Sequence, residues 1–389
     1  MNKKLLAVAI GAALAAPMFA QAAVTVGGQA HVSADYVDTL DVQTGVHNRK
    51  EWNLSSNVSN IFIKADEDLG GGMKAIFFLQ EYFRLDDNGG AAQTAGASTV
   101  ATNTPSVNYG NRMHDAPAYV GLSSKAGTIL LGNQDTLTKL ANRSVDLFNN
   151  AIGDTRNLGM DNTRFQNSVS YTSPTMGGVS LAWQHSTNVD NGIVTPLTTT
   201  PNGFIPATPQ TNGAQNYGDV FAVKLEQGPV VVNGAYMRID NRLSASTAYY
   251  TNQVTDLSAS VKAGPARIVA AYQKNNNSGN AVGVQTAIWS LGTALTFGSE
   301  TVKAQFSSLN AMSATSVGLN STVWSIGYDH AFSKTFTGYA AFAVADNNSG
   351  ARVGMTGGGG HGDTAVVSSN VTQGGPQQNG ASLGVIYSF

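Results

Sequence analysis

Few residues in this 389-residue chain have the types and spacing that catalysis needs. His31 and Asp35 would lie on the same face of a β-strand, and a His–Asp pair can take part in acid–base chemistry. No positioned nucleophile accompanies them, so a pair exposed to water inside a channel is the favoured interpretation. The stretch GGGGHGD, Gly357 to Asp363, lacks the lysine and the strand–helix setting of a phosphate-binding loop. We therefore predict that the protein is not an enzyme.

The sequence gives no sign of a bound metal or cofactor. The chain contains no cysteine, which excludes disulfides and thiolate ligands, and it has no His-Glu-x-x-His zinc pattern. Without Lys3 and Lys4, 20 basic residues stand against 24 acidic ones. This slightly acidic balance argues against a nucleic-acid partner. We expect no cofactor.

The first 22 residues have the pattern of a secretory signal. Lys3 and Lys4 precede an apolar run from Leu5 to Ala16, and small residues at Ala20 and Ala22 suit a signal peptidase. A membrane-spanning helix needs about 18 or more apolar residues, which this run does not provide. We expect residues 1–22 to be a signal peptide and residues 23–389 to form one β-structure.

The rest of the chain alternates apolar and polar residues with a period of two, which is typical of β-strands with two different faces. Between Val24 and Tyr36 the even positions are apolar or small, and the odd positions are mostly polar. The last residues repeat the pattern, with Leu383, Val385, Tyr387 and Phe389 on one side. Lysines obey the same rule: Lys224, Lys262 and Lys303 stand opposite the apolar positions of their segments.

The connections between these segments alternate in length. Seven are short and rich in Gly, Pro, Ser or Asp, as in tight hairpins: they lie near residues 68–72, 124–127, 174–178, 227–229, 264–265, 298–300 and 333–334. Eight are longer and polar: about 38–50, 87–112, 134–165, 188–217, 240–253, 275–283, 310–320 and 347–378. Seven turns and eight loops join 16 strands.

An even number of strands, with short turns at one rim and long loops at the other, is typical of an all-β, antiparallel transmembrane β-barrel. A lysine facing lipid would cost about 2–4 kcal/mol at the bilayer midplane, which explains why charges avoid the apolar face. In a β-sandwich the apolar faces would pack inward, and 16 strands with polar interiors could not fill one core. The sequence therefore predicts a closed barrel whose last strand pairs with its first.

Five stretches of the chain, in order, resemble the general porins of Gram-negative bacteria. They are SNIFIKADEDLGGGMKAIFFLQE (59–81), APAYVGLSSKAGTILLGNQDTLTKL (116–140), RFQNSVSYTSPTMGGVSLAWQHS (164–186), WSIGYDHAFSKTFTGYAAFAVADN (324–347) and the terminal GVIYSF. The resemblance implies a trimer of 16-stranded barrels in the outer membrane, in contact with lipid and lipopolysaccharide. It also implies that the third long loop, about 133–165, folds into the channel, and that Phe389 is read by the outer-membrane assembly machinery.

In such porins, acids on the third loop commonly face a basic wall across the narrowest part of the pore. The resemblance then assigns the acidic side to Asp135, Asp146, Asp154 and Asp161. Candidates for the basic wall are Lys64, Lys74, Arg84, Arg164, Arg238 and Arg267. Lys139, Arg143 and Arg156 also lie on the loop, so the sign of ion selectivity stays open. The acidic balance of the chain favours a weak preference for cations.

The function expected from the sequence is a water-filled channel for passive diffusion of ions and small hydrophilic solutes. The alternative within the same class is a substrate-specific outer-membrane channel, whose conductance a solute would saturate. An outer-membrane lipid hydrolase would need a Ser–His–acid group at one rim. A β-repeat adhesin would show a fixed internal period, and the irregular loop lengths speak against it.

Overall fold

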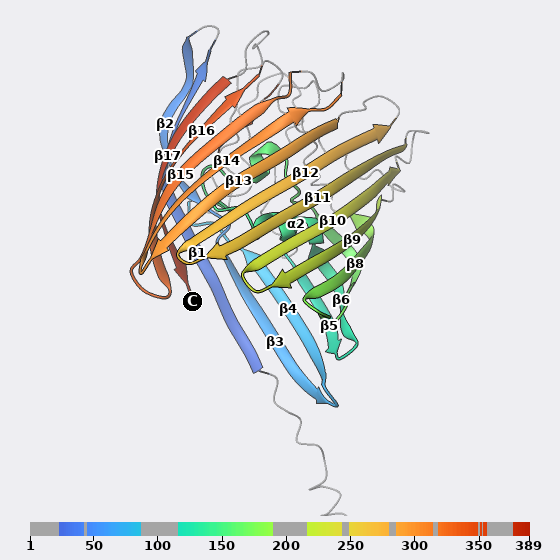
Figure 1. Cartoon of the computed structure of the whole chain (residues 1–389). Helices are drawn as coiled ribbons and strands as arrows, with labels where there is room; N and C mark the ends of the chain where they lie inside the picture. Colours follow the sequence, from blue (N-terminus) through green and yellow to red (C-terminus); the bar gives the residue numbers. More distant parts are fainter. Residues whose placement is uncertain are drawn as a thin grey trace, which may run out of the picture.

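The computed structural model describes residues 23–42, 45–86, 116–189, 216–242, 249–279, 285–313, 318–348, 351, 353–355 and 376–389. The predicted signal peptide lies outside these residues. The described residues form one antiparallel sheet that closes on itself (Figure 1). None of their helices is long and apolar enough to cross a membrane.

The strands follow the chain around the barrel. They are β1 (Ala23–Asp41), β2 (Val46–Ser56), β3 (Asn60–Gly70), β4 (Met73–Tyr82), β5 (Ala118–Ser124), β6 (Gly127–Asp135), β7 (Arg164–Thr172), β8 (Val179–Val189), β9 (Asn216–Gln227), β10 (Val230–Arg242), β11 (Tyr249–Ala263), β12 (Ala266–Gly279), β13 (Gln285–Phe297), β14 (Glu300–Ala311), β15 (Ser321–Ala331), β16 (Phe336–Asn347) and β17 (Pro376–Ser388). Two short helices, α2 (Leu137–Arg143) and η1 (Thr155–Leu158), lie between β6 and β7.

The 17 labelled segments make 16 barrel strands, as predicted, because β2 and β3 are two halves of one strand. Both halves pair with β1: β2 with the part from Val32 onward, and β3 with the part up to Gln29. The break between them falls at Val58, whose φ of 59° is rare for a β-branched residue.

The seven short turns are confirmed, and several long connections are shorter than predicted. The first was expected over residues 38–50, yet β1 and β2 stay paired as far as Asp41 and Val46. The strands on either side of residues 243–248 extend into the loop predicted over 240–253, and β12 extends to Gly279 within the loop predicted over 275–283. The sequence predicted loops at these strand ends because their residues are polar, although backbone pairing continues through them.

The two faces of the sheet differ as the alternation predicted. On β15 the side chains of Trp324, Ile326 and Tyr328 are 41–50% exposed on the outside, whereas Ser325 between them is buried inside the barrel. The closing seam joins β1 to β17 in continuous register from Gln29↔Ser388 to Asp41↔Pro376. Phe389 lies at the rim of the short turns (Figure 1).

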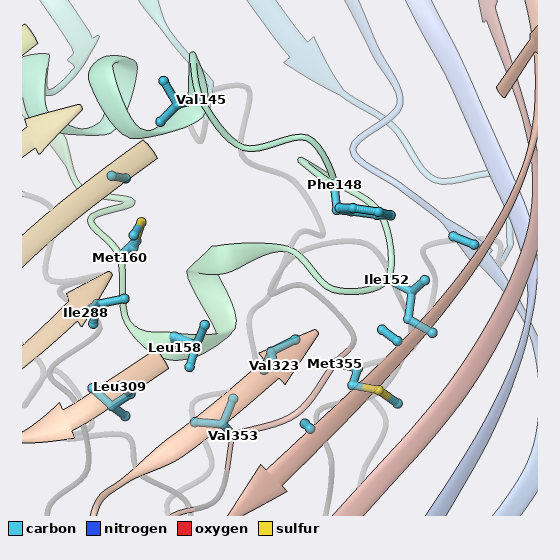
Figure 2. Close-up of a cluster of buried hydrophobic side chains, with 14 of the residues drawn as sticks. Val145, Phe148, Ile152, Leu158, Met160, Ile288, Leu309, Val323, Val353 and Met355 are labelled. Carbon is cyan, nitrogen blue, oxygen red and sulfur yellow. The ribbon is translucent and has the colours of Figure 1, made fainter. Parts of the chain in front are cut away.

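The interior is less polar than the alternation predicted. On β12–β16 many inward positions are apolar and buried: Val269, Ala271, Ile288, Leu309, Val323, Ala341, Ala343 and Ala345. They pack against apolar side chains of residues 145–160, as Figure 2 shows. The main hydrophobic core of the molecule therefore lies inside the barrel, between this segment and one side of the wall.

Candidate pore constriction

The segment between β6 and β7, called loop 3 below (residues 136–163), lies against the inner wall. Its helix α2 contacts β9, β10 and β11, and η1 contacts β14. The Thr136 hydroxyl accepts a hydrogen bond from the Lys139 amide and so caps the start of α2. Asp154 caps η1 in the same manner, and Gly159, with a φ of 94°, ends it. These local signals make loop 3 a structured element.

Apolar side chains fix the middle of loop 3 to the barrel. Phe148, Ile152, Leu158 and Met160 are at most 1% exposed, and they pack on the inward apolar residues of β12–β16 (Figure 2). Burying each such side chain contributes about 1.5–3 kcal/mol. Met355 holds the segment from the other side, because its carbonyl accepts a hydrogen bond from the Gly153 amide at 2.9 Å.

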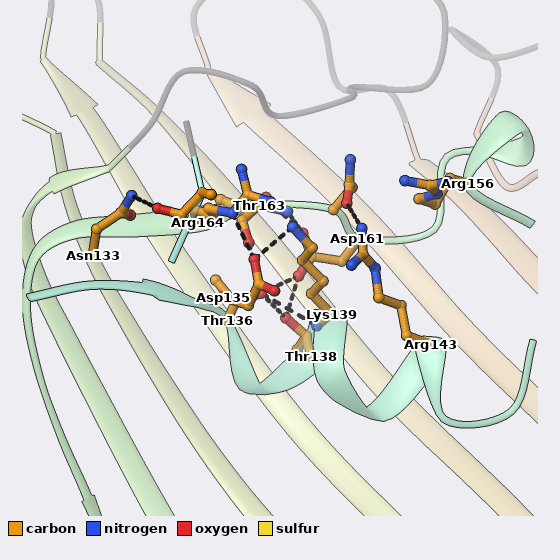
Figure 3. A network of polar contacts seen from close by, with 12 residues as sticks. Asn133, Asp135, Thr136, Thr138, Lys139, Arg143, Arg156, Asp161, Thr163 and Arg164 are labelled. Atoms are coloured by element: carbon orange, nitrogen blue, oxygen red, sulfur yellow. Dashed lines mark hydrogen bonds and ion pairs between the residues drawn. The ribbon is translucent and has the colours of Figure 1, made fainter. Parts of the chain in front are cut away.

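Asp135 forms the centre of an ion-pair cluster at the start of loop 3. Its Oδ1 lies 2.6 Å from Lys139 Nζ and 2.7 Å from Arg164 Nε (Figure 3). Arg164 also donates to the Tyr82 hydroxyl of β4 at 2.8 Å. Lys139 is 1% exposed, and this burial lowers its pKa to about 7, although Asp135 acts in the opposite direction. Asp135, at the end of β6, is thus paired with one cation on α2 and one at the start of β7.

Asp154 and Asp161 hold the loop's own backbone and side chains. Asp154 pairs with the Arg156 guanidinium and accepts from the Asn150 amide at 2.8 Å. Burial acts to raise the pKa of Asp154, but the charge and hydrogen bonds of Arg156 outweigh it and keep that pKa low. Asp161 accepts from the hydroxyls of Thr136 and Thr163, both at 2.6 Å, and from Thr138.

Asp146 lies where loop 3 meets β14. Its carboxylate accepts from the Phe148 amide at 2.9 Å, from the Thr155 amide and hydroxyl at 2.9 and 2.7 Å, and from Gln305 at 3.2 Å. Burial and the neighbouring charge of Asp154 together raise the pKa of Asp146 to about 6. All four predicted acids are therefore engaged in holding loop 3 together; their place at the constriction stays a prediction.

One of the three cations of loop 3 forms no ion pair among the described residues. Arg143, at the end of α2, donates to the Asn162 side chain at 3.0 Å, and within the described part of the chain no carboxylate pairs with it. Burial, reinforced by the charge of Arg156, lowers the pKa of Arg143. Arg267 of β12 donates to the Ser144 carbonyl, next to Arg143. Arg267 thus reaches the backbone at the end of α2, one residue after Arg143.

The other predicted wall residues lie apart from one another. Lys64 pairs with Asp66 at 2.9 Å and is half exposed. Lys74 lies near the turn that joins β3 to β4. Arg84 pairs with Asp86, whose carboxylate also accepts from the Ser56 amide. Of the six predicted wall residues, Arg164 and Arg267 contact loop 3 or its ends.

The prediction that Arg238 lines the inner wall is wrong. Arg238 shares a face of β10 with Tyr236, which is 39% exposed and lies opposite the exposed Phe221 of β9. The other face carries Ala235, Met237 and Ile239, which are buried inside the barrel. On this part of β10 the inner face is apolar because α2 covers it, so the usual arrangement of polar residues inside and apolar residues outside does not hold.

The interpretation of His31 and Asp35 as a pair exposed to water is also wrong. They are 2% and 1% exposed. His31 Nε2 lies 2.9 Å from the Tyr339 hydroxyl, and the Ser33 hydroxyl donates to Asp35 at 3.0 Å. Asn57, at the break between β2 and β3, donates to Ser33 at 2.8 Å and covers the group. The cluster joins β1 to the strand break and to β16.

Sequence reasoning missed an aromatic stack on the inner wall of β3–β5. The ring centroids of Phe62 and Phe78 are 5.9 Å apart, and those of Phe78 and Tyr119 are 5.2 Å apart, with nearly parallel planes. Phe62 and Phe78 occupy the same strand phase as Lys64 and Lys74. That shared phase was the signal that could have placed them inside.

Comparison with known proteins agrees with this architecture. A family model described as Gram-negative porin matches residues 6–350. The major outer membrane protein P.IB of Neisseria gonorrhoeae is 27% identical over 202 residues, and the match spans about half of each chain, 49% and 50%.

Solved outer-membrane proteins share the fold. An anion-selective porin from Comamonas acidovorans superposes with a TM-score of 0.69 at 20% identity, covering 95% of this chain and all of that one. A trimer form of Vibrio cholerae OmpT gives 0.62 at 14% identity, with coverage of 95% and 99%. Because the family model matches residues 6–350 of the chain and the strands close into a barrel, this chain belongs to the Gram-negative porin family.

Proposed function

We propose that the protein is a water-filled channel of the Gram-negative outer membrane for passive diffusion of ions and small hydrophilic solutes. The observation that carries the proposal is a closed barrel with an apolar outer face and a charged loop fixed to its inner wall. A homotrimer is part of the proposal, supported by the trimer form of a structural neighbour. Contacts with lipopolysaccharide, and recognition of Phe389 by the assembly machinery, also belong to it.

Loop 3 is proposed as the constriction, with its cations as the groups that select ions. Each of the four predicted acids is occupied by donors or cations of the loop itself. Arg143 forms no ion pair among the described residues, and Arg267 donates to the Ser144 carbonyl at the end of α2. A charged side chain in a narrow opening attracts ions of the opposite sign. The geometry thus favours a preference for anions, against the weak cation preference expected from the overall charge.

Planar-bilayer recording under a salt gradient tests this function directly. We expect openings in groups of three and a reversal potential that indicates anion preference. The double variant Arg143→Gln with Arg267→Gln should shift that potential toward cations, because it removes two positive charges at the end of α2. Arg238→Gln is the matched control, since it removes an arginine from the outer face. Equal shifts in the double variant and the control would refute the assignment.

The aromatic stack of Phe62, Phe78 and Tyr119 favours the second candidate, a substrate-specific channel. Aromatic rings attract flat apolar surfaces of a solute, and the Lys64–Asp66 pair on the same wall could bind its polar groups. The same recording separates the two candidates. A current that rises linearly with solute concentration supports general diffusion, and a saturable, solute-blocked current supports specific passage.

A further inference from the structure

The inner wall on the far side of the lumen from loop 3 is formed by β3, β4 and β5. Loop 3 packs on the inward apolar residues of β12–β16. With β2 and β3 counted as one strand, β4 and β12 are eight strands apart in either direction around the closed sheet, so they lie opposite each other. The open part of the lumen therefore lies between loop 3 and β3–β5, and a solute that passes the loop moves along this wall.

The rings of the aromatic stack are inward side chains of this wall. Phe77, the neighbour of Phe78 in β4, is 40% exposed on the outer face, so Phe78 points inward. Phe62, Phe78 and Tyr119 are half-buried, and the planes of neighbouring rings lie within 25° of each other. Nearly parallel rings that are only half-buried leave apolar surface on which another aromatic ring can stack.

Two glycines let large side chains spread over this wall. The Phe62 ring lies over Gly27 of β1, where a Cβ would come within 2.6 Å of it. Leu130 of β6 lies over Gly121 of β5, where the corresponding distance is 2.5 Å. The apolar surface therefore continues from β1 to β6 instead of ending at the three rings.

Lys64 places a positive charge beside the rings. Phe78 is the direct register partner of both Lys64 and Tyr119, so the three side chains form one row across β3, β4 and β5. The Lys64 ammonium lies 2.9 Å from the Asp66 carboxylate, and the two side chains are 49% and 42% exposed. An ion pair this exposed contributes little to stability, so Lys64 can exchange Asp66 for an anionic group of a solute.

We propose that this wall binds planar aromatic carboxylates, of which benzoate is the simplest. The ring of the solute stacks on Phe78 and Tyr119, and its carboxylate accepts a hydrogen bond from the Lys64 ammonium. The inference rests on the proposed channel function and names the substrate class of the substrate-specific candidate. Contact with one wall alone implies weak, rapidly exchanging binding, and a channel needs binding that is weak enough for the solute to leave.

Binding is measured on the purified, detergent-solubilised protein by saturation-transfer NMR, without any transport. Benzoate is compared with cyclohexanecarboxylate, which has the same charge and a similar size but no aromatic ring. We expect the wild type to bind benzoate about 2- to 12-fold more tightly, which is the range that an aromatic contact provides. Equal affinities would overturn the proposal. They would leave the diffusion channel standing, because its conductance is measured separately in salt alone.

Two variants locate the binding on this wall. Phe78→Leu should abolish the preference for benzoate, and Phe77→Leu is the matched control because it changes the adjacent ring on the outer face. Lys64→Gln should weaken benzoate binding about threefold and leave the binding of benzyl alcohol, which has no charge, unchanged. The proposal fails if Phe77→Leu and Phe78→Leu have equal effects, or if Lys64→Gln weakens the binding of both solutes equally.

Discussion

At the scale of single residues, the charges of loop 3 differ in what they do. Asp135, Asp154 and Asp161 are surrounded by donors or cations that the loop itself provides. The composition of residues 133–165 could not distinguish these roles, because a carboxylate facing water and one holding a helix cap have the same sequence signal. Only the folded loop shows that Arg143 lacks a carboxylate partner within the described residues.

Asp146 should make a contribution to the free energy of unfolding that decreases as pH rises, which is the reverse of the usual effect of an acidic residue. Its pKa of about 6 lies above the ordinary value of 3.8, so the folded state binds the proton more tightly than the unfolded state. This contribution is fully present below about pH 4 and is lost as pH rises through 6. It amounts to at most about 3 kcal/mol. The free energy of unfolding in urea is measured for wild type and Asp146→Asn across this range, and the difference between the two proteins should change with pH. A difference that stays constant would contradict this prediction.

At the scale of elements, the strands were predictable and the attachment of loop 3 was not. Period-two alternation located β15 and β17 because their outer faces meet lipid along their whole length. Val269 and Ile288 interrupt the polar inner phase, and in the sequence they read as irregularities. They are explained by the apolar underside of loop 3, which reaches them only in the folded barrel. Loop 3 also covers the apolar inner face of β10, which is why the sequence predicted the wrong face for Arg238.

The apolar contacts with the inner wall should hold loop 3 in position, and weakening them should leave the barrel itself folded. Ile152→Ala removes a side chain that is fully buried near Met355 and Gly380, and such truncations cost about 2–5 kcal/mol. We expect a folded barrel with a noisier single-channel current. Leu140→Ala, at a position that is 51% exposed, is the control and should leave the current quiet. Equal noise in both variants would mean that the buried contacts do not position the loop.

At the scale of the whole molecule, the closing seam depends on the last residue. The Phe389 amide donates to the Gly28 carbonyl at 3.1 Å, and the Gly28 amide donates back at 2.9 Å. The Phe389 ring lies over Gly28, where a Cβ would come within 2.6 Å of it. The sequence predicted closure between the last and first strands, but not that a ring would cover a glycine there.

Phe389→Ala should therefore weaken the barrel even when no assembly machinery is present. The ring is half exposed, so we expect a loss of about 1–2 kcal/mol. The measurement is refolding from urea into detergent, which separates seam stability from recognition in the cell. Phe297→Ala is the control, since this ring is similarly exposed and lies at the end of β13, which pairs with β12 and β14 away from the seam. Equal losses would assign the effect to aromatic burial in general.

The ion pairs of loop 3 should determine how the channel responds to changes in salt concentration. Dissolved salt screens exposed charges strongly and enclosed pairs much less. The pairs that shape the loop, such as Asp135 with Lys139, should persist from dilute to concentrated media, so the opening keeps its width. In the proposed channel the attraction of Arg143 and Arg267 for passing ions should weaken as salt rises, so we expect it to discriminate between ions best in fresh water.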